Sequence, residues 1–150
     1  MPQSFSVVLV HLIFSTKDRE RLIGASVEAD LHAFLGGIAR DCGCPALAVG
    51  GTADHVHVLA SLSRTQTLAQ LVEELKTRSS KWIKSKGGTH KVFHWQNGYG
   101  AFSVGKSQED AVRKYIAAQK QHHRKTRFKD EFVGFLKKYG IAYDERYLWD

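Results

Sequence analysis

The stretch "DHVHVLASL", Asp54 to Leu62, predicts a strand whose two faces differ in chemistry. Successive side chains of a strand point to opposite sides, so Val56 and Val58 face a hydrophobic core while His55 and His57 share the other face. Two imidazoles about 6–7 Å apart along a strand can converge on one ion and leave coordination positions open, as a catalytic metal requires. The alternative is a half-exposed strand with two polar positions, so the surrounding sequence has to decide.

Outward from this strand, aliphatic and aromatic runs predict further strands. The Gly50-Gly51 step followed by "TAD" indicates an antiparallel hairpin into the strand that carries His55. Asn97-Gly98 is the strongest short hairpin signal in the chain, so a second hairpin is expected around it. The strands are expected at residues 4–14, 46–51, 55–62, 91–96 and 98–104.

Helical spacing of apolar residues predicts four helices between and after these strands. They are expected from Ser26 to Ile38, from Thr67 to the Gly87-Gly88 pair, over 108–123 with Ser107 as the cap, and over 128–140. This order is typical of an α+β fold: a ferredoxin-like or RRM-like antiparallel sheet with helices packed on one face. No repeat or low-complexity linker interrupts the chain, which predicts one domain over residues 1–150.

The composition favours an acidic partner. Lys and Arg total 22 against 15 acidic residues, which gives a net charge of +7, and nucleic acid is the commonest acidic partner. Cys42 and Cys44 are too close for an ordinary disulfide, so we expect a reducing cytoplasm. The two cysteines with the two histidines would offer four zinc ligands, but their spacing is tighter than that of zinc knuckles. The opening "MPQSFSVVLVHLIF" lacks a basic leader and is too short to span a membrane, so no membrane partner is expected.

The stretch "GAFSVGKS", Gly100 to Ser107, matches the phosphate-loop pattern and raises the alternative of a nucleotide-binding protein. A phosphate loop needs small, turn-forming residues between its glycines, whereas "AFSV" alternates like a strand. We find no apolar run that ends in an Asp able to hold Mg²⁺. The Gly105-Lys106-Ser107 end is therefore interpreted as a strand-to-helix turn.

The third expected helix carries a second polar anomaly. Val112, Tyr115, Ile116 and Gln119 follow helical spacing and lie along one stripe. Gln119 places an uncharged amide where a core stripe favours an apolar residue. A metal held by two imidazoles and an amide carbonyl, with a tyrosine hydroxyl beside it, is equipped for covalent attack on a phosphodiester.

Several blocks in order resemble one known family. "DHVHVLASL", "LKTRSSKWI", "WQNGYGAFSV", "YIAAQKQHHRKTRFKDEFVGFLKKYGI" and "YDERYLW" are similar to the single-tyrosine HUH transposases of the smallest bacterial insertion sequences, the IS200-like transposases. In that resemblance His55, Val56 and His57 fill the HUH motif. Tyr115 matches the nucleophile and Gln119 matches the metal ligand on the helix.

The resemblance implies a transposase that cleaves and rejoins single-stranded DNA with hairpin ends at insertion-sequence ends. Tyr115 would form a 5′-phosphotyrosine and release a 3′-hydroxyl, so no ATP is needed to restore the phosphodiester. The reaction would depend on Mg²⁺ or Mn²⁺: imidazole ligands lean toward Mn²⁺ and phosphate oxygens toward Mg²⁺. The resemblance also implies a homodimer whose active sites are completed in trans by the partner's tyrosine helix.

Basic residues supply candidate DNA contacts. The second expected helix resembles the hairpin-contact region of the family, and a further basic side chain precedes the first helix. The candidates are Lys76, Arg78, Lys81, Lys84 and Arg19. Another alternative is a non-enzymatic RRM-like RNA-binding module, because "NGYGAF" faintly resembles the aromatic strand of those domains.

Overall fold

The computed structural model describes residues 2–149, which form one antiparallel sheet and five α-helices. The strand order in the sheet is β2-β3-β1-β4, and each neighbouring pair is antiparallel. The strands are β1 (Leu9–Ser15), β2 (Ala46–Gly51), β3 (His55–Ser61) and β4 (Gly100–Val104). The helices are α1 (Ala25–Asp41), α2 (Leu68–Lys84), α3 (Glu109–Ala117), α4 (Gln119–His122) and α5 (Phe128–Lys138). The predicted α+β antiparallel fold is confirmed.

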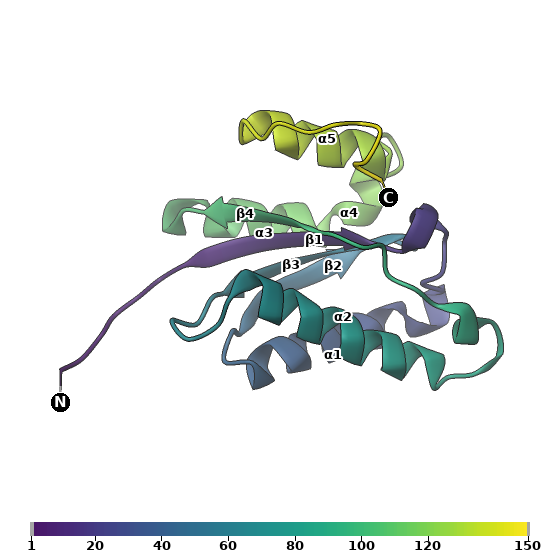
Figure 1. Cartoon of the computed structure of the whole chain (residues 1–150), viewed down its shortest axis with the longest axis horizontal. Helices are drawn as coiled ribbons and strands as arrows, with labels where there is room; N and C mark the ends of the chain where they lie inside the picture. Colours follow the sequence, from purple (N-terminus) through teal and green to yellow (C-terminus); the bar gives the residue numbers. More distant parts are fainter. Residues whose placement is uncertain (1, 150) are drawn as a thin grey trace.

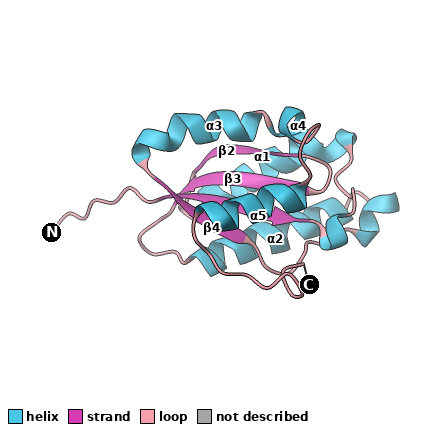
Figure 2. Ribbon diagram, turned by 90° about the horizontal axis from the view of Figure 1, so that it is seen from above, coloured by secondary structure: helices cyan, strands magenta, loops and turns pink. Residues whose placement is uncertain are grey.

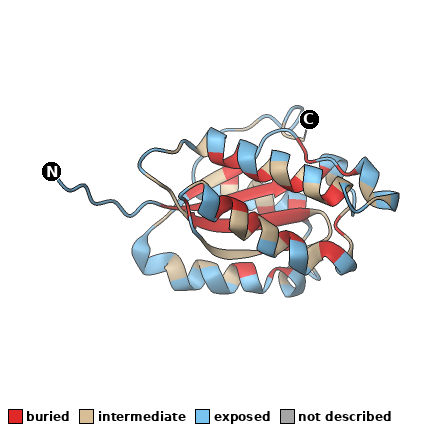
Figure 3. Cartoon of the chain, turned by 90° about the horizontal axis from the view of Figure 1, so that it is seen from below, coloured by how far each residue is buried: buried red, intermediate tan, exposed pale blue. Residues whose placement is uncertain are grey.

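One face of the sheet packs a hydrophobic core that is covered by α1 and α2 (Figure 1). Val56 and Val58 of β3 meet aliphatic side chains from both helices there, as the alternation predicted. α2 begins at Thr67, where Thr67 and Gln70 form a capping box that satisfies free backbone amides of the first turn. Seen from below, the buried residues of the sheet lie behind α1 and α2 (Figure 3). Each fully buried aliphatic side chain contributes about 1.5–3 kcal/mol.

The opposite face of the sheet is covered by α3, α4 and α5 (Figure 2). The prediction of helices on one face therefore describes α1 and α2, and the structure adds a second helical layer. α3 lies against β2 because Gly50 has no side chain: a Cβ there would stand 2.5 Å from the carbonyl oxygen of Ile116. Gly100 has the same role under α5, where a Cβ would meet the Phe132 ring at 2.7 Å.

The expected hairpin around Asn97-Gly98 does not form. Residues 91–96 end a 3-10 turn (Gly88–Val92) and then contribute Trp95 to an isolated bridge with Thr16. The Trp95 ring packs against Phe14 and its indole N–H donates to Ser79 Oγ, so long-range aromatic packing outweighs the local turn signal. β4 pairs with β1 instead. β1 also begins later than expected, at Leu9 rather than at residue 4.

The third expected helix is interrupted. Its first turn is a 3-10 turn (Lys106–Gln108), and Ser107 makes no side-chain cap. α3 ends at Ala117, and Ala118 leaves helical geometry with φ −95° and ψ 14° before α4 begins at Gln119. The break sets the direction from which Gln119 approaches the sheet. Within residues 2–149, no helix combines the length and apolar character needed to cross a membrane.

Candidate active site

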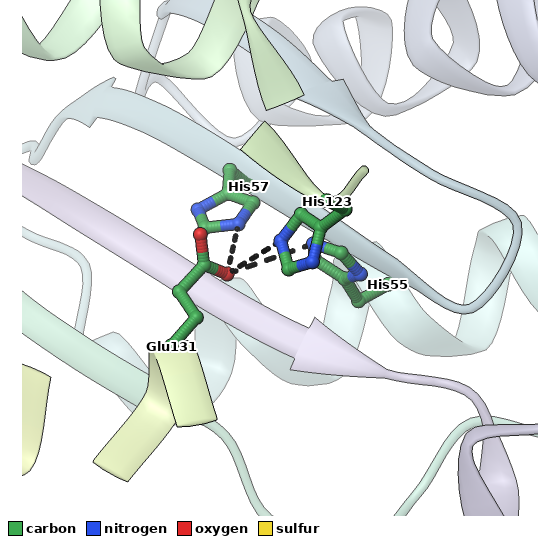
Figure 4. A group of neighbouring side chains, drawn as sticks. All are labelled: His55, His57, His123 and Glu131. Carbon is green, nitrogen blue, oxygen red and sulfur yellow. Dashed lines mark hydrogen bonds and ion pairs between the residues drawn. The ribbon is translucent and has the colours of Figure 1, made fainter. Parts of the chain in front are cut away.

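Four side chains converge between the sheet and its second helical layer. His55 and His57 come from β3, His123 follows α4, and Glu131 lies on α5. Their ligand atoms all lie within 4.8 Å of one another. Figure 4 shows the three imidazoles around one oxygen of the Glu131 carboxylate. Both strand histidines are 0% exposed, so the alternative of two solvent-facing polar positions is wrong.

The distances within the cluster centre on Oε1 of Glu131. That oxygen lies 3.1 Å from Nε2 of His57, 3.1 Å from Nε2 of His123 and 3.7 Å from Nε2 of His55. The contact with His57 is a hydrogen bond. Nε2 of His123 is buried without a hydrogen-bond partner, because its alignment toward the carboxylate is poor. Hydrogen bonding alone therefore leaves one buried nitrogen of the cluster unsatisfied.

A second layer of contacts orients the two strand imidazoles. Nδ1 of His55 lies 2.7 Å from Oδ1 of Asp54, and Nδ1 of His57 lies 2.7 Å from Nε2 of His11. A carboxylate only accepts hydrogen bonds, so Nδ1 of His55 carries the proton and its Nε2 lone pair faces the cluster. Metal-bound histidines show this arrangement, in which the far nitrogen donates to a second residue.

Burial controls the protonation of the strand face. It lowers the pKa of His11 to about 3 and that of His57 to about 4, so both imidazoles are neutral near pH 7. Burial alone would raise the pKa of Glu131, but the imidazoles of His123 and His57 outweigh it and hold that pKa well below its usual range. An ionised carboxylate thus faces the neutral imidazole of His57, and both groups are in the protonation state that binds a metal ion.

The donor chemistry of this centre fits a divalent cation. Oε1 of Gln119 lies 2.9 Å from Nε2 of His55, and it joins the imidazole and carboxylate atoms already described. In the tautomer that Asp54 selects, Nε2 of His55 and Oε1 of Gln119 each offer an electron pair, and a cation between them satisfies both lone pairs. Imidazole nitrogen together with carboxylate and amide oxygen is a common ligand set for divalent metals.

Tyr115 stands at the edge of the same cluster. Its ring lies 5.8 Å from the His57 ring and 6.3 Å from the His11 ring, and its hydroxyl donates a hydrogen bond to Oε2 of Glu131. The side chain is only partly buried. Burial and the neighbouring Glu131 raise the pKa of the hydroxyl, so ionising it requires added positive charge nearby. The structure therefore brings together the four predicted residues His55, His57, Tyr115 and Gln119 within one chain.

Three residues of the site were not assigned from the sequence, of which Glu131 and His11 are buried and His123 is partly buried. Glu131 and His123 lie in helical and connecting segments where a charged residue usually faces solvent. Of these two, the sequence carried a signal for Glu131 alone, because this residue falls on the same helical stripe as the apolar Phe128 and Phe135. His11 is the only polar residue in the apolar run of residues 7–14. Its ring packs on Phe135 and contacts His57.

The predicted DNA-contact residues lie away from this cluster. Lys76 is partly buried on α2, where its ammonium donates to the carbonyl oxygens of Gln96 and Gly98 and burial lowers its pKa to about 8. Arg78 pairs with Asp41 at 3.1 Å. Lys81 and Lys84 line an open groove of about 530 Å³ on α2. Arg19 is separate from these and stacks on Trp149 at 5.3 Å.

A second and larger basic groove, of about 880 Å³, opens directly onto the cluster. His123 and Asp54 are part of its lining, so the groove leads to the imidazoles. Most charged side chains along it are basic: Arg19, Arg21, Lys120, Arg124, Arg127 and Lys129. A groove lined in this way suits the phosphates of a nucleic-acid strand. Of these residues, the sequence analysis selected Arg19 for DNA contact.

The two alternative functions are not favoured by the structure. Residues Gly100 to Val104 of the phosphate-loop match form β4, paired with β1, and Lys106 is held by Glu109 at 2.7 Å. A strand cannot wrap phosphates with its backbone amides as a phosphate loop does. RNA-recognition domains stack bases on open sheet aromatics, whereas Phe102 of β4 is buried beneath Phe135 and Tyr139.

A known family and two solved structures that this chain resembles are all described as transposases. The family model described as "Transposase IS200 like" matches residues 4–119. A solved structure of a candidate transposase from Deinococcus radiodurans superposes with a TM-score of 0.62 at 23% identity, over 79% of this chain and 96% of that one. A REP-associated tyrosine transposase bound to a REP hairpin superposes with a TM-score of 0.61 at 13% identity, over 82% of this chain and 73% of that one. Curated proteins yield no match to the chain.

Proposed function

This chain belongs to the IS200-like transposase family, and from that premise we propose that it cleaves and rejoins single-stranded DNA through a covalent bond to Tyr115. The observation that carries the proposal is the position of the Tyr115 hydroxyl. It lies beside buried imidazoles and donates a hydrogen bond to a carboxylate of the same cluster. A nucleophile next to charge-stabilising groups in a partly dry site is what phosphodiester cleavage requires.

The proposed reaction exchanges one phosphodiester bond for another. The Tyr115 oxygen forms a bond to the scissile phosphorus while the bond from phosphorus to the 3′ oxygen breaks. The phenolic proton is lost from Tyr115 and the departing 3′ oxygen gains one, which leaves a 5′-phosphotyrosine and a 3′-hydroxyl. In the reverse direction, a 3′-hydroxyl of another strand attacks the phosphotyrosine and the tyrosine oxygen leaves. One ester replaces another in each direction, so no nucleotide is hydrolysed.

The chain's own residues prepare this reaction. His55, His57 and Gln119 would hold a divalent cation, Mg²⁺ or Mn²⁺, and the cation would supply positive charge that neutralises the phosphate and favours ionised tyrosine. Asp54 and His11 keep the two imidazoles in the orientation and tautomer for that role. Glu131 holds the Tyr115 hydroxyl in place.

The substrate is proposed to be DNA with a hairpin end and an unpaired flank. The structural neighbour is bound to a REP hairpin, and this chain has basic surfaces on two sides of its sheet. The groove at His123 suits the unpaired strand because it reaches the cluster at His123 and Asp54. The groove with Lys81 and Lys84 suits the hairpin stem. Both assignments rest on phosphate recognition by lysine and arginine.

We also propose that the active form is a homodimer. Excision of a DNA segment requires two cuts, and each chain carries one Tyr115 at this site, so a twofold dimer supplies the second nucleophile. In the described conformation Tyr115 lies beside His57 of its own chain. Within one chain the tyrosine and the histidines are therefore already side by side without a helix from the partner. That the partner's tyrosine helix completes the site in the dimer stays a prediction.

The test is formation of a covalent adduct. The protein is incubated with Mn²⁺ and radiolabelled hairpin DNA that carries an unpaired flank, and denaturing gels detect protein–DNA species. We expect an adduct with wild type and none with Tyr115→Phe. Tyr147→Phe is the matched control, because Tyr147 is 65% exposed and lies outside the cluster. An adduct that survives in Tyr115→Phe, or is absent from wild type on every candidate element end, would reject the proposal.

A further inference from the structure

Glu131 and His123 extend the ligand set that the family resemblance supplies. We propose that both residues bind the metal ion, so that the centre has three imidazoles and a carboxylate beside the Gln119 amide. This inference rests on the proposed function only in taking the cluster as the metal site of that reaction. It assigns one ligand on α5 and one in the segment after α4. Neither position belongs to the HUH motif or to the glutamine that accompanies it.

The spacing of the four atoms is the first argument. Ligands on a tetrahedral ion, each at about 2.0–2.2 Å from it, stand about 3.3–3.6 Å from one another. Oε1 of Glu131 lies 3.1, 3.1 and 3.7 Å from the Nε2 atoms of His57, His123 and His55. Two of these three distances are slightly shorter, and one is slightly longer, than the distance between ligand atoms that share a single ion.

The unsatisfied nitrogen of His123 is the second argument. Nε2 of His123 is buried and lacks a hydrogen-bond partner, although it lies 3.1 Å from a carboxylate oxygen. A hydrogen bond requires the nitrogen to aim at the oxygen, whereas two ligands of one ion both aim at a point between them. The misalignment is thus expected for a ligand and costly for a merely packed histidine.

Glu131 has a further consequence because its two oxygens face different groups. Oε1 faces the imidazoles, while Oε2 accepts hydrogen bonds from the Tyr115 hydroxyl and, at 3.1 Å, from the Gln119 amide nitrogen. As a ligand, this carboxylate also fixes the nucleophile beside the ion. Loss of Glu131 is therefore expected to weaken metal binding and to release the tyrosine together.

Three imidazoles change the metal preference of the site. Mg²⁺ favours oxygen ligands and gives up water reluctantly, while Mn²⁺, Co²⁺ and Zn²⁺ bind imidazole more tightly. The extended ligand set therefore favours a transition metal. Mn²⁺ bound to the protein is expected to resist competition by at least a tenfold excess of Mg²⁺.

The experiment measures metal binding without DNA. Free Mn²⁺ is followed by electron paramagnetic resonance in titrations of wild type, Glu131→Gln, His123→Gln and the control His90→Gln, whose histidine lies in the distant 3-10 turn. We expect each of the first two variants to weaken affinity about 10–100-fold or more and the control to match wild type. Affinities within twofold of wild type for both variants, with intact circular dichroism spectra, would overturn the inference.

A measurement on the wild type alone covers the case in which a variant fails to fold. Pulsed paramagnetic resonance of bound Mn²⁺ counts the coordinating imidazole nitrogens: three support the inference and two overturn it. The two proposals also fail separately. Three bound imidazoles without any DNA adduct would keep these ligands and reject strand transfer, whereas a Tyr115 adduct with two imidazoles would do the reverse.

Discussion

Val58 and His57 are neighbours on β3 and both are fully buried, yet they belong to two different interiors. Val58 lies among aliphatic side chains under α1 and α2, where burial alone stabilises the fold. His57 lies under α3 and α5, where burial disfavours its charged form and each ring nitrogen needs a partner. The contrast teaches that the second face adds a buried polar network to its apolar packing, and a face of that kind is where chemistry is expected.

The largest expected effect on activity comes from a substitution on the polar face of the sheet. His57→Gln removes the Nε2 atom that faces Glu131 and the Nδ1 atom that faces His11. We expect adduct formation to fall by about 10²–10³-fold or more, because charge stabilisation at the scissile phosphate is lost. Initial rates of adduct formation with hairpin DNA and Mn²⁺ measure this. A variant that stays cooperatively folded and retains wild-type rates would contradict the role of His57.

The apolar face is expected to give the opposite result. Leu12→Ala removes a fully buried side chain of the core under α1 and α2, so the free energy of unfolding is expected to fall by about 3 kcal/mol. Adduct formation per folded molecule, measured well below the melting temperature, is expected to stay at the wild-type rate. Denaturant unfolding and the adduct assay on the same preparation check both parts. Loss of activity without loss of stability would remove the distinction between the two faces.

Much of this contrast was readable from the sequence. Alternation along "DHVHVLASL" places the valines and histidines on opposite faces, and helical spacing places Tyr115 and Gln119 on one stripe, as the structure has them. Both inferences depend only on the local geometry of one element. The antiparallel pairing of β2 with β3 and the start of α2 at Thr67 follow from the same local rules, whereas the N-cap of α1 is Gly24 and the expected cap Ser26 lies inside the helix.

What escaped prediction depends on contacts between distant segments. Glu131 reads as an ordinary surface residue of a charged helix until α5 is folded over β3. The hairpin expected at Asn97-Gly98 failed because Trp95 finds a better partner in Phe14, more than eighty positions earlier. The basic stretch of α2 attracted attention by its charge, while the groove at His123 gathers its arginines from two distant segments, residues 19–21 and 124–127.

The pH dependence of stability sharpens the contrast further. His11 and His57 are neutral in the folded chain down to about pH 4, whereas the unfolded chain protonates both below about pH 6.5. The unfolded state then binds more protons, so stability falls as the pH falls from 6.5, by about 1 kcal/mol per residue at pH 5.5.

His123 and Glu131 do not alter the expected fall in stability between pH 6.5 and about pH 4.5. The pKa of His123 is raised by Glu131 despite burial, so its stabilising effect is already complete below pH 6.5. The effect of Glu131, whose pKa is lowered, fades only below about pH 4.5. Denaturant unfolding of the metal-free protein between pH 7 and 5 measures the slope. A flat profile would contradict buried neutral imidazoles.

The smallest expected effects distinguish the two basic grooves. Arg124→Ala removes one charge at the cluster, so the salt dependence of binding to unpaired DNA is expected to flatten by about 0.7 in log-log slope. Lys81→Ala is expected to flatten the slope by about 0.9 for a blunt hairpin stem and to leave unpaired DNA unchanged. Fluorescence anisotropy titrations over a range of salt concentrations measure both. If each variant changed binding of the unpaired DNA and of the hairpin stem equally, the assignment of one groove to each part of the substrate would be wrong.

The most direct test of the central claim is to locate the covalent bond. Wild-type protein is trapped with hairpin DNA and Mn²⁺, digested with nuclease and protease, and sequenced by tandem mass spectrometry. The account predicts a residual 5′-phosphonucleotide on the peptide that contains Tyr115. A nucleotide found instead on Tyr99, Tyr139 or any other residue would contradict it.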